Sequence, residues 1–204
     1  MADKKAAEKL TAACAGQTAT VRRGEKQQRN ASPPKLYDLT SLQRDGNRLF
    51  GYTAQQVLDY AQALYEKKLL TYPRTDSNYL TEDTAATVPE LLEQSVSSLP
   101  FSVEVGPTDI SRVIDASKVS DHHALLPTMQ VKQDALAALP AGERNILTLV
   151  IVRLLCAVSE KQVYEDTAVE LDCGGTSFAA KGRVVTSPGW KAVEQAFLST
   201  LKQK

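Results

Sequence analysis

The segment from Pro140 to Glu160 places the strongest constraint on what this chain can fold into. Within it, the residues from Ile146 to Val158 are almost all apolar, around the whole helical circumference rather than along one stripe. A helix of this kind has to be buried on nearly every side. The stretch contains Arg153 and is too short to cross a bilayer, which takes about 20 apolar residues. The segment therefore predicts a buried core helix.

Two more helices are indicated by composition and capping. Ala2 to Ala15 is rich in Ala, Lys and Glu and is predicted to be a helix that ends near Gly16. Thr81, followed by two acidic residues, starts another helix that runs toward Ser97. Pro89 is expected to interrupt or kink it.

A pair of helices is predicted between these two. The first, SLQRDGNRLF, takes Thr40 or Ser41 as its N-cap and ends at Gly51. Thr53 caps the second, whose apolar residues fall at helical spacing. These residues are Val57, Leu58, Ala61, Leu64 and Tyr65. Two helices joined by a short turn form a helix-turn-helix unit, although a plain helical hairpin is the commoner outcome of such a pattern.

Strands are predicted near both ends of the chain. Gln17 to Arg23 is expected to be a strand, and the polar stretch Gly24 to Pro34 is expected to be a mobile loop. Tyr164 to Asp172 and Ser177 to Val185 alternate like two strands of a hairpin. Residues 190–201 are expected to form a helix or an irregular tail.

The order of these elements indicates an α+β fold that is mainly α. Pairing the first strand with the last hairpin would leave the helical middle as an inserted domain. The predicted divisions are residues 1–39, 40–161 and 162–204, the outer two belonging to one β-rich domain.

Charge and cysteine content limit the possible functions. Lys plus Arg and Asp plus Glu are both 24, so net charge gives no argument for nucleic acid. Locally, residues 21–50 carry seven basic and three acidic side chains, whereas residues 76–121 carry two basic and nine acidic ones. This distribution fits a chain that touches nucleic acid on one side, and it fits two ordinary solvated surfaces about equally well.

The three cysteines lack the spacing of a disulfide framework or a zinc site. The N-terminus has no apolar run like that of a secretory signal. We therefore expect a cytoplasmic protein with no metal ligands in this chain and no membrane partner.

The run from Leu70 to Ser77, LTYPRTDS, carries the residues best suited to chemistry. Pro73 disfavours helical geometry at Tyr72, so Tyr72 and Arg74 point the same way in an extended chain. An arginine fork binds phosphate oxygens, and a phenol is a nucleophile once positive charge lowers its pKa from about 10. Asp76 is expected to hold the guanidinium. Alone, Tyr72 would more often be a packing residue.

Both histidines of the chain lie in a second run, SDHHALLPT, at His122 and His123. Adjacent histidines point in different directions and rarely bind one metal. A protonated imidazole can contact a phosphate oxygen or a leaving 3′ oxygen. A polar loop closed by Pro127 is an equally good interpretation of this run by itself.

Together, LTYPRTDS and SDHHALLPT, about fifty residues apart, resemble the type IA DNA topoisomerases, particularly the topoisomerase III branch. The stretch YDLTSLQR upstream is also similar to that family. The resemblance implies that Tyr72 is the nucleophile and forms a 5′-phosphotyrosyl bond, with Arg74 on the scissile phosphate and His122 assisting. It implies DNA contacts from a set of side chains near this site. These are Arg74, Asp76, Ser77, His123, Gln43 and Arg44. Asn78 stands where this branch often has arginine, and Leu125 and Leu126 replace the usual isoleucines.

The resemblance also implies partners. In this family a Toprim domain supplies the acidic residues that hold Mg²⁺, and no such motif is found here. The chain is therefore expected to be a piece: the helical, winged-helix-like tyrosine domain between two parts of the β-rich arch domain. It would act on single-stranded DNA, without ATP, together with the rest of the topoisomerase chain.

The alternative is a non-catalytic helix-turn-helix or winged-helix DNA-binding module. The helix after Thr53 is a poor reader of guanine, because its polar residues include no arginine. These residues are Gln55, Gln56, Gln62, Lys67 and Lys68. A phosphatase or a tyrosine recombinase fits less well: there is no Cys-x5-Arg loop, and the expected dispersed catalytic arginines are missing.

Overall fold

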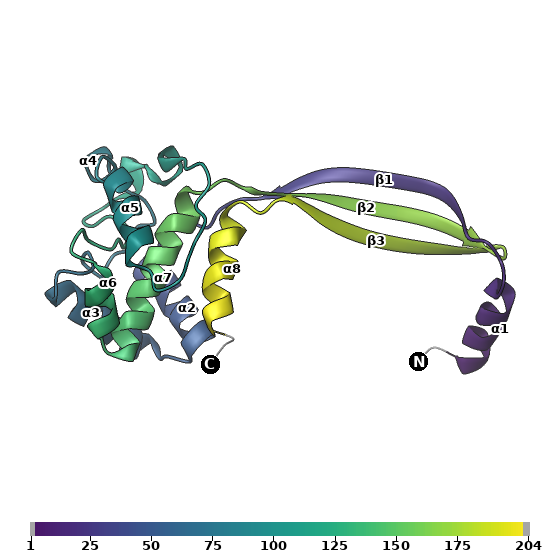
Figure 1. The fold of residues 1–204 in the computed structure, drawn as a ribbon, viewed down its shortest axis with the longest axis horizontal. Coiled ribbons are helices and arrows are strands. Elements are labelled where there is room, and N and C mark those ends of the chain that lie inside the picture. The colour runs from purple at the N-terminus through teal and green to yellow at the C-terminus, as the bar shows by residue number, and fades with distance from the viewer. Residues whose placement is uncertain (1–2, 202–204) are drawn as a thin grey trace. The chain divides into compact units, whose positions relative to one another are not determined.

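The computed structural model describes residues 3–201, which divide into two compact units. Figure 1 draws the elements of both. Of the described residues, one unit comprises 3–31 and 162–188, and the other comprises 32–161 and 189–201. The α+β class is confirmed, because one unit is built on an antiparallel sheet and the other is helical.

The first unit is a three-stranded sheet in which β2 lies between β1 and β3. The strands are β1 (Thr20–Ala31), β2 (Gln162–Cys173) and β3 (Thr176–Ser187), and both pairings are antiparallel. The predicted pairing of the first strand with the last hairpin is confirmed. The hairpin turns at Gly174 and Gly175, whose φ angles of 57° and 76° suit a tight hairpin turn and favour glycine.

The expectation of a loop from Gly24 to Pro34 is wrong, because β1 continues to Ala31. Nearly every residue of β1 is exposed, so its sequence lacks the apolar alternation that marks a half-buried strand. Backbone pairing with β2 holds it instead, helped by cross-strand ion pairs such as Lys26 with Glu165 at 3.0 Å.

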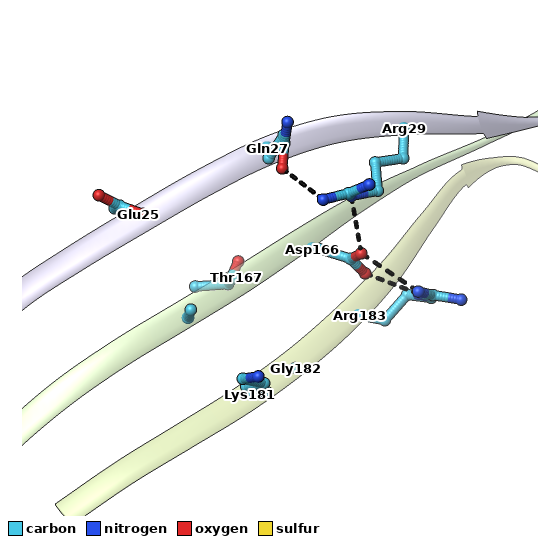
Figure 2. A pocket seen from close by; sticks show the side chains of 9 residues that line it. Glu25, Gln27, Arg29, Asp166, Thr167, Lys181, Gly182 and Arg183 are labelled. Carbon is cyan, nitrogen blue, oxygen red and sulfur yellow. Dashed lines mark hydrogen bonds and ion pairs between the residues drawn. The ribbon is translucent and has the colours of Figure 1, made fainter.

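One face of the sheet carries a hollow of about 420 Å³, in which Arg29, Asp166 and Arg183 are paired with one another. Figure 2 shows Arg29 and Arg183 converging on Asp166. The Nε atoms lie 3.4 and 2.7 Å from the carboxylate oxygens. The hydrogen bond from Arg183 lowers the pKa of Asp166 below its ordinary value. We interpret this cluster as a cross-strand tie of the sheet.

The helix α1 (Lys4–Cys14) completes the first unit, as predicted. The Cys14 thiol lies 3.4 Å from the backbone oxygen of Cys173, at the start of the hairpin turn. A Cβ at Gly174 would meet the backbone oxygen of Ala13 at 2.4 Å, so this close approach requires glycine.

In the second unit, α7 (Ala141–Val158) is the core helix and is buried almost throughout, as predicted. Five other helices surround the core. They are α2 (Leu39–Phe50), α3 (Ala54–Glu66), α5 (Val88–Ser98), α6 (Gln133–Ala138) and α8 (Trp190–Leu201). All of them contact α7 or a helix that does.

The pair α2–α3 is present, with one cap that differs from the prediction. Asp38, not Thr40 or Ser41, is the N-cap of α2, and it forms a capping box with Ser41 at N3. Thr53 caps α3 as expected. The helices pack closely because Gly46 lies in α2: a Cβ there would sit 2.7 Å from the side chain of Val57 in α3.

The helix expected from Thr81 is divided in two. It consists of α4 (Glu82–Ala85) and α5, and Pro89 lies in the first turn of α5, where its missing N–H costs nothing. Two short 3₁₀ helices follow, η1 (Ile110–Val113) and η2 (Ala116–Lys118).

The helix α8 packs with the helical unit rather than with the sheet. Trp190, Val193 and Phe197 are buried in the same core cluster as α7. The chain therefore passes from one compact unit to the other near residues 31, 161 and 188. The sequence had predicted that the whole of 162–204 belongs to the β-rich part. The winged-helix arrangement and the division into family domains stay predictions.

Candidate functional site

The chain enters the Tyr72 segment through an unusual helix end. Lys68 follows α3 with a φ of 61°, in the left-handed region, and donates its N–H to Tyr65 O at 2.8 Å. The N–H of Leu69 bonds to Leu64 O at 2.9 Å. These two bonds form a Schellman motif, with a lysine in the position that usually holds glycine. They turn the chain sharply from α3 into an extended segment.

The residues of the second run clamp the start of this segment. Thr71 donates its N–H to Leu126 O at 3.0 Å, and its hydroxyl accepts from Leu126 N–H at 2.9 Å. Leu70 and Pro127 form an antiparallel bridge. Further along, the Thr75 hydroxyl donates to His122 O at 2.8 Å. The two motifs recognised in the sequence therefore lie side by side.

The Tyr72 ring is half-buried between two other rings. Its centroid lies 4.4 Å from that of His122, with the planes tilted by 47°. On α3, Tyr65 packs edge-on against it at 5.4 Å and 79°. Tyr65 was expected on the apolar face of α3, yet it is 41% exposed. Its contact with Tyr72 was missed, because residues seven apart are neighbours here only through the Schellman turn.

Exposure alternates after Tyr72, which confirms an extended chain. Pro73, Thr75 and Ser77 are buried, whereas Arg74 and Asp76 are exposed. Within residues 3–201, no hydrogen bond or ion pair engages the guanidinium of Arg74. Asp76 accepts a weak hydrogen bond from Ser120 at 3.3 Å and does not hold Arg74, contrary to the expectation. Arg74, two residues after Tyr72, is thus exposed.

Ser77, one of the predicted DNA contacts, instead has partners within the protein, and so does its neighbour Asn78. Ser77 is only 3% exposed, and its hydroxyl donates to Lys118 O at 2.8 Å. The expectation of a DNA contact from Ser77 does not fit this burial. The Asn78 side-chain amide donates to Leu36 O at 2.9 Å, and this hydrogen bond joins two loops.

The two histidines point to different places, as adjacent residues in an extended chain do. His122 is exposed against Tyr72, and half-buried His123 lies with its Nδ1 atom 2.7 Å from Ala124 O. His123 lines a separate open hollow of about 430 Å³ together with Thr71 and Met129. Of the two histidines, only His122 has a ring contact with Tyr72.

The two residues of α2 that were predicted to contact DNA, Gln43 and Arg44, are not bonded to Tyr72. Gln43 donates to Ala54 O at 3.0 Å and so ties α2 to the start of α3. Arg44 is exposed. Among the described residues, no hydrogen bond or ring contact joins either of them to Tyr72.

Replacing Lys68 by glycine is expected to raise the free energy of unfolding by about 1 kcal/mol, because a left-handed conformation is costly for a residue with a Cβ. Urea unfolding of the chain measures it. Lys67→Gly is the matched control, since Lys67 has a φ of −78° and pairs with Glu143; it should destabilise. Equal effects of the two changes would contradict the strain at Lys68.

The described residues show neither a metal-binding cluster nor a membrane-spanning helix. Across residues 3–201, no group of three His, Cys, Asp or Glu side chains is gathered as a metal ion would require. None of the helices in that range has the length and hydropathy needed to cross a bilayer.

Comparison with known proteins agrees with the two motifs. A family model described as DNA topoisomerase matches residues 1–203. The DNA topoisomerase 3 of Bacillus licheniformis is 39% identical over 191 residues, which cover 90% of this chain and 26% of that protein. The DNA topoisomerase 3 of a Bacillus cereus strain is 41% identical over 183 residues, covering 87% and 25%. This chain spans about a quarter of the length of these relatives.

A solved structure shows the same fold. Full-length topoisomerase I from Thermotoga maritima aligns with a TM-score of 0.67 at 19% identity, over 96% of this chain and 32% of that one. The fold, the paired motifs and the identity to topoisomerase 3 relatives agree, and this chain belongs to the type IA DNA topoisomerase family, in its topoisomerase III-like branch.

Proposed function

We propose that the protein of which this chain forms part cleaves and rejoins one DNA strand through a transient 5′-phosphotyrosyl bond at Tyr72. The observation that carries the proposal is the position of the Tyr72 ring, packed between His122 and Tyr65, with Arg74 exposed and unpaired two residues later in the extended segment. The nucleophile is thus held by its ring while its hydroxyl keeps no partner among the described residues.

The chemistry balances with the groups present. The phenolic oxygen gives up its proton and attacks phosphorus, the bond to the 3′ oxygen breaks, and that oxygen takes up a proton, so no net proton is gained or lost. Arg74 is suited to bind the two non-bridging phosphate oxygens, whose charge grows in the transition state. His122 is suited to assist at the phosphate or the leaving 3′ oxygen. Since one phosphoester replaces another, the reverse attack by the 3′ hydroxyl reseals the strand without ATP.

The remaining parts of the proposal concern the whole enzyme. A Toprim domain elsewhere in the protein would hold Mg²⁺, which would stabilise negative charge at the phosphate. Residues 40–161 would be the winged-helix-like tyrosine domain and the sheet unit part of the arch. The substrate would be single-stranded DNA in the cytoplasm, and the outcome relaxation or decatenation of DNA.

The side chains of α3 argue against the alternative of a DNA-reading helix-turn-helix module. Each glutamine that would read bases is bonded within the helix or its cap. Gln55 donates to Asp59, Gln56 closes the capping box with Thr53, and Gln62 donates to Glu66. A helix whose amides are engaged in this way has little to offer a base edge.

The test of the proposal is relaxation of negatively supercoiled plasmid without ATP. The intact protein is expected to relax it in the presence of Mg²⁺, and the isolated chain of residues 1–204 is expected to be inactive, because half of the charge stabilisation would be missing. Intact protein that requires ATP, or an isolated chain that relaxes plasmid by itself, would contradict this assignment.

A further inference from the structure

The second unit carries a hollow of about 300 Å³ that the proposed chemistry does not use. Its wall includes two prolines, an aromatic ring and three cationic residues, and no acidic residue lines it. These residues are Pro33, Pro34, Lys35, Tyr79, Arg112 and Lys161. The volume is at the lower end of that of small-molecule sites.

The cations of this hollow differ in how they are held. Arg112 is fixed, because it pairs with Asp109 at 3.1 Å and donates to Ser159 O at 2.9 Å. Lys35 and Lys161 are exposed, and neither has an ion-pair partner among the residues the structure describes. Two positive charges are therefore left for a ligand.

The ring of Tyr79 lies among these charges. The Lys35 ammonium lies 5.1 Å from its centroid, and that of Lys118 lies 4.7 Å away. Lys118 is held in turn by Asp115 at 2.5 Å. The backbone of Tyr79 is fixed as well, since its oxygen accepts from Ala124 N–H at 2.9 Å. The ring is half-buried, so part of it remains open to the hollow.

The chemistry of this wall selects a ligand with a negative charge and a flat apolar part. Lysine and arginine bind phosphate oxygens, whereas an aromatic ring beside prolines stacks with a planar group. Tyr79 follows Tyr72 by seven residues, which in the extended segment corresponds to no more than about 25 Å. A strand bound at Tyr72 is therefore only a few nucleotides away.

We propose that this hollow is a second subsite for single-stranded DNA, which takes one nucleotide away from the cleavage site. Its phosphate lies on Lys35, Lys161 and Arg112, and its base lies against Tyr79 and the prolines. The proposal rests on the proposed function for the identity of the ligand. It adds a site that holds the strand without taking part in the chemistry.

The test is anisotropy of a labelled oligothymidylate over a series of salt concentrations, with the chain carrying Tyr72→Phe so that no covalent bond forms. Removing both charges with Lys35→Gln and Lys161→Gln is expected to make the slope of log affinity against log salt shallower by about 0.7, since this is roughly the contribution of one phosphate contact with a single strand. The control is Lys132→Gln with Lys181→Gln, two exposed lysines outside the hollow, which should leave the slope unchanged.

A second variant tests the ring. Tyr79→Leu is expected to weaken oligothymidylate binding roughly tenfold, and Tyr79→Phe is expected to restore it, because stacking needs the ring and not the hydroxyl. On an abasic oligonucleotide, Tyr79→Leu should have no effect. A thermal melt of each variant confirms that it is folded.

Three outcomes would overturn the subsite. The two lysine pairs could change the salt slope equally, or the parent chain could fail to bind oligothymidylate. Inorganic phosphate alone could also displace bound DNA at low concentration. Failure of the proposed function would look different. In that case the intact protein would form no covalent adduct, whereas oligothymidylate binding would still depend on Lys35 and Lys161.

Discussion

Replacing Tyr72 by phenylalanine in the intact enzyme is expected to abolish the covalent protein–DNA adduct and to leave the fold unchanged. The change removes only the hydroxyl that is proposed to attack phosphorus, and the ring keeps its contacts with His122 and Tyr65. The hydroxyl has no hydrogen-bond partner within residues 3–201, so its loss should change the free energy of unfolding by less than about 0.5 kcal/mol. An adduct assay on a single-stranded oligonucleotide, run beside a thermal melt, measures both quantities.

The matched control is Tyr65→Phe. Tyr65 is a tyrosine in ring contact with Tyr72, and phenylalanine keeps the edge-on packing at 5.4 Å. The adduct should form at close to its normal level in this variant. An adduct in Tyr72→Phe would refute the assignment of the nucleophile. A large loss of stability in Tyr72→Phe would instead identify a structural tyrosine whose hydroxyl is needed by the fold.

The sequence predicted those elements whose stability comes from local signals. The apolar circumference of α7, the glycine turn between β2 and β3, and the cap of α3 at Thr53 were all foreseen. The strand β1 was not, since it is polar on both faces and is held by pairing with a strand more than 130 residues away in sequence. Backbone hydrogen bonds and cross-strand ion pairs do not produce the alternation of apolar and polar residues by which a strand is recognised in a sequence.

The site shows the same division. The resemblance identified Tyr72 and His122, and the structure brings their rings together. The resemblance assigned Asp76 and Ser77 by their place in a motif, but the partners of a side chain depend on its neighbours in the fold. Asp76 accepts a hydrogen bond from Ser120, and buried Ser77 donates one to the backbone oxygen of Lys118 in η2. The contact of Tyr65 depends on the left-handed Lys68, which no residue preference would suggest.

A polar network links the chain before α2 to the core helix α7. Tyr37 is 2% exposed and donates to Asp45 at 2.6 Å, while Arg153 of α7 donates to the Tyr37 hydroxyl at 3.0 Å and to Asp45 at 2.5 Å. The guanidinium also lies 4.0 Å from the centroid of the Tyr37 ring. Since Tyr37 and Leu125 form an isolated antiparallel bridge, this network supports the segment that carries His122.

Arg153→Met is expected to lower the free energy of unfolding by about 2 kcal/mol, because the partly buried Asp45 carboxylate loses the less exposed of its two arginine partners and the Tyr37 hydroxyl loses a donor. The control is Arg48→Met. Arg48 pairs with the same Asp45 at 2.9 Å, but its side chain is 59% exposed, so the cost should be below about 1 kcal/mol. Urea unfolding measures both. Equal costs would mean that the two arginines are equivalent partners of Asp45.

The pH dependence of stability separates loss of charge pairing from loss of packing in Arg153→Met. Burial alone would raise the pKa of Asp45, but hydrogen bonds from Tyr37 and Arg48 and the charge of Arg153 outweigh it, so the pKa lies below its ordinary value. A carboxylate whose pKa is lowered by folding stabilises the protein above its unfolded pKa, about 3.9, and that stabilisation is lost as the pH falls through the folded value. Without Arg153 the folded pKa rises, so Arg153→Met should differ most from the parent at pH 7 and least near pH 3. If packing were the cause, the difference between the two proteins would be the same at both pH values, and adding Asp45→Asn would recover none of it.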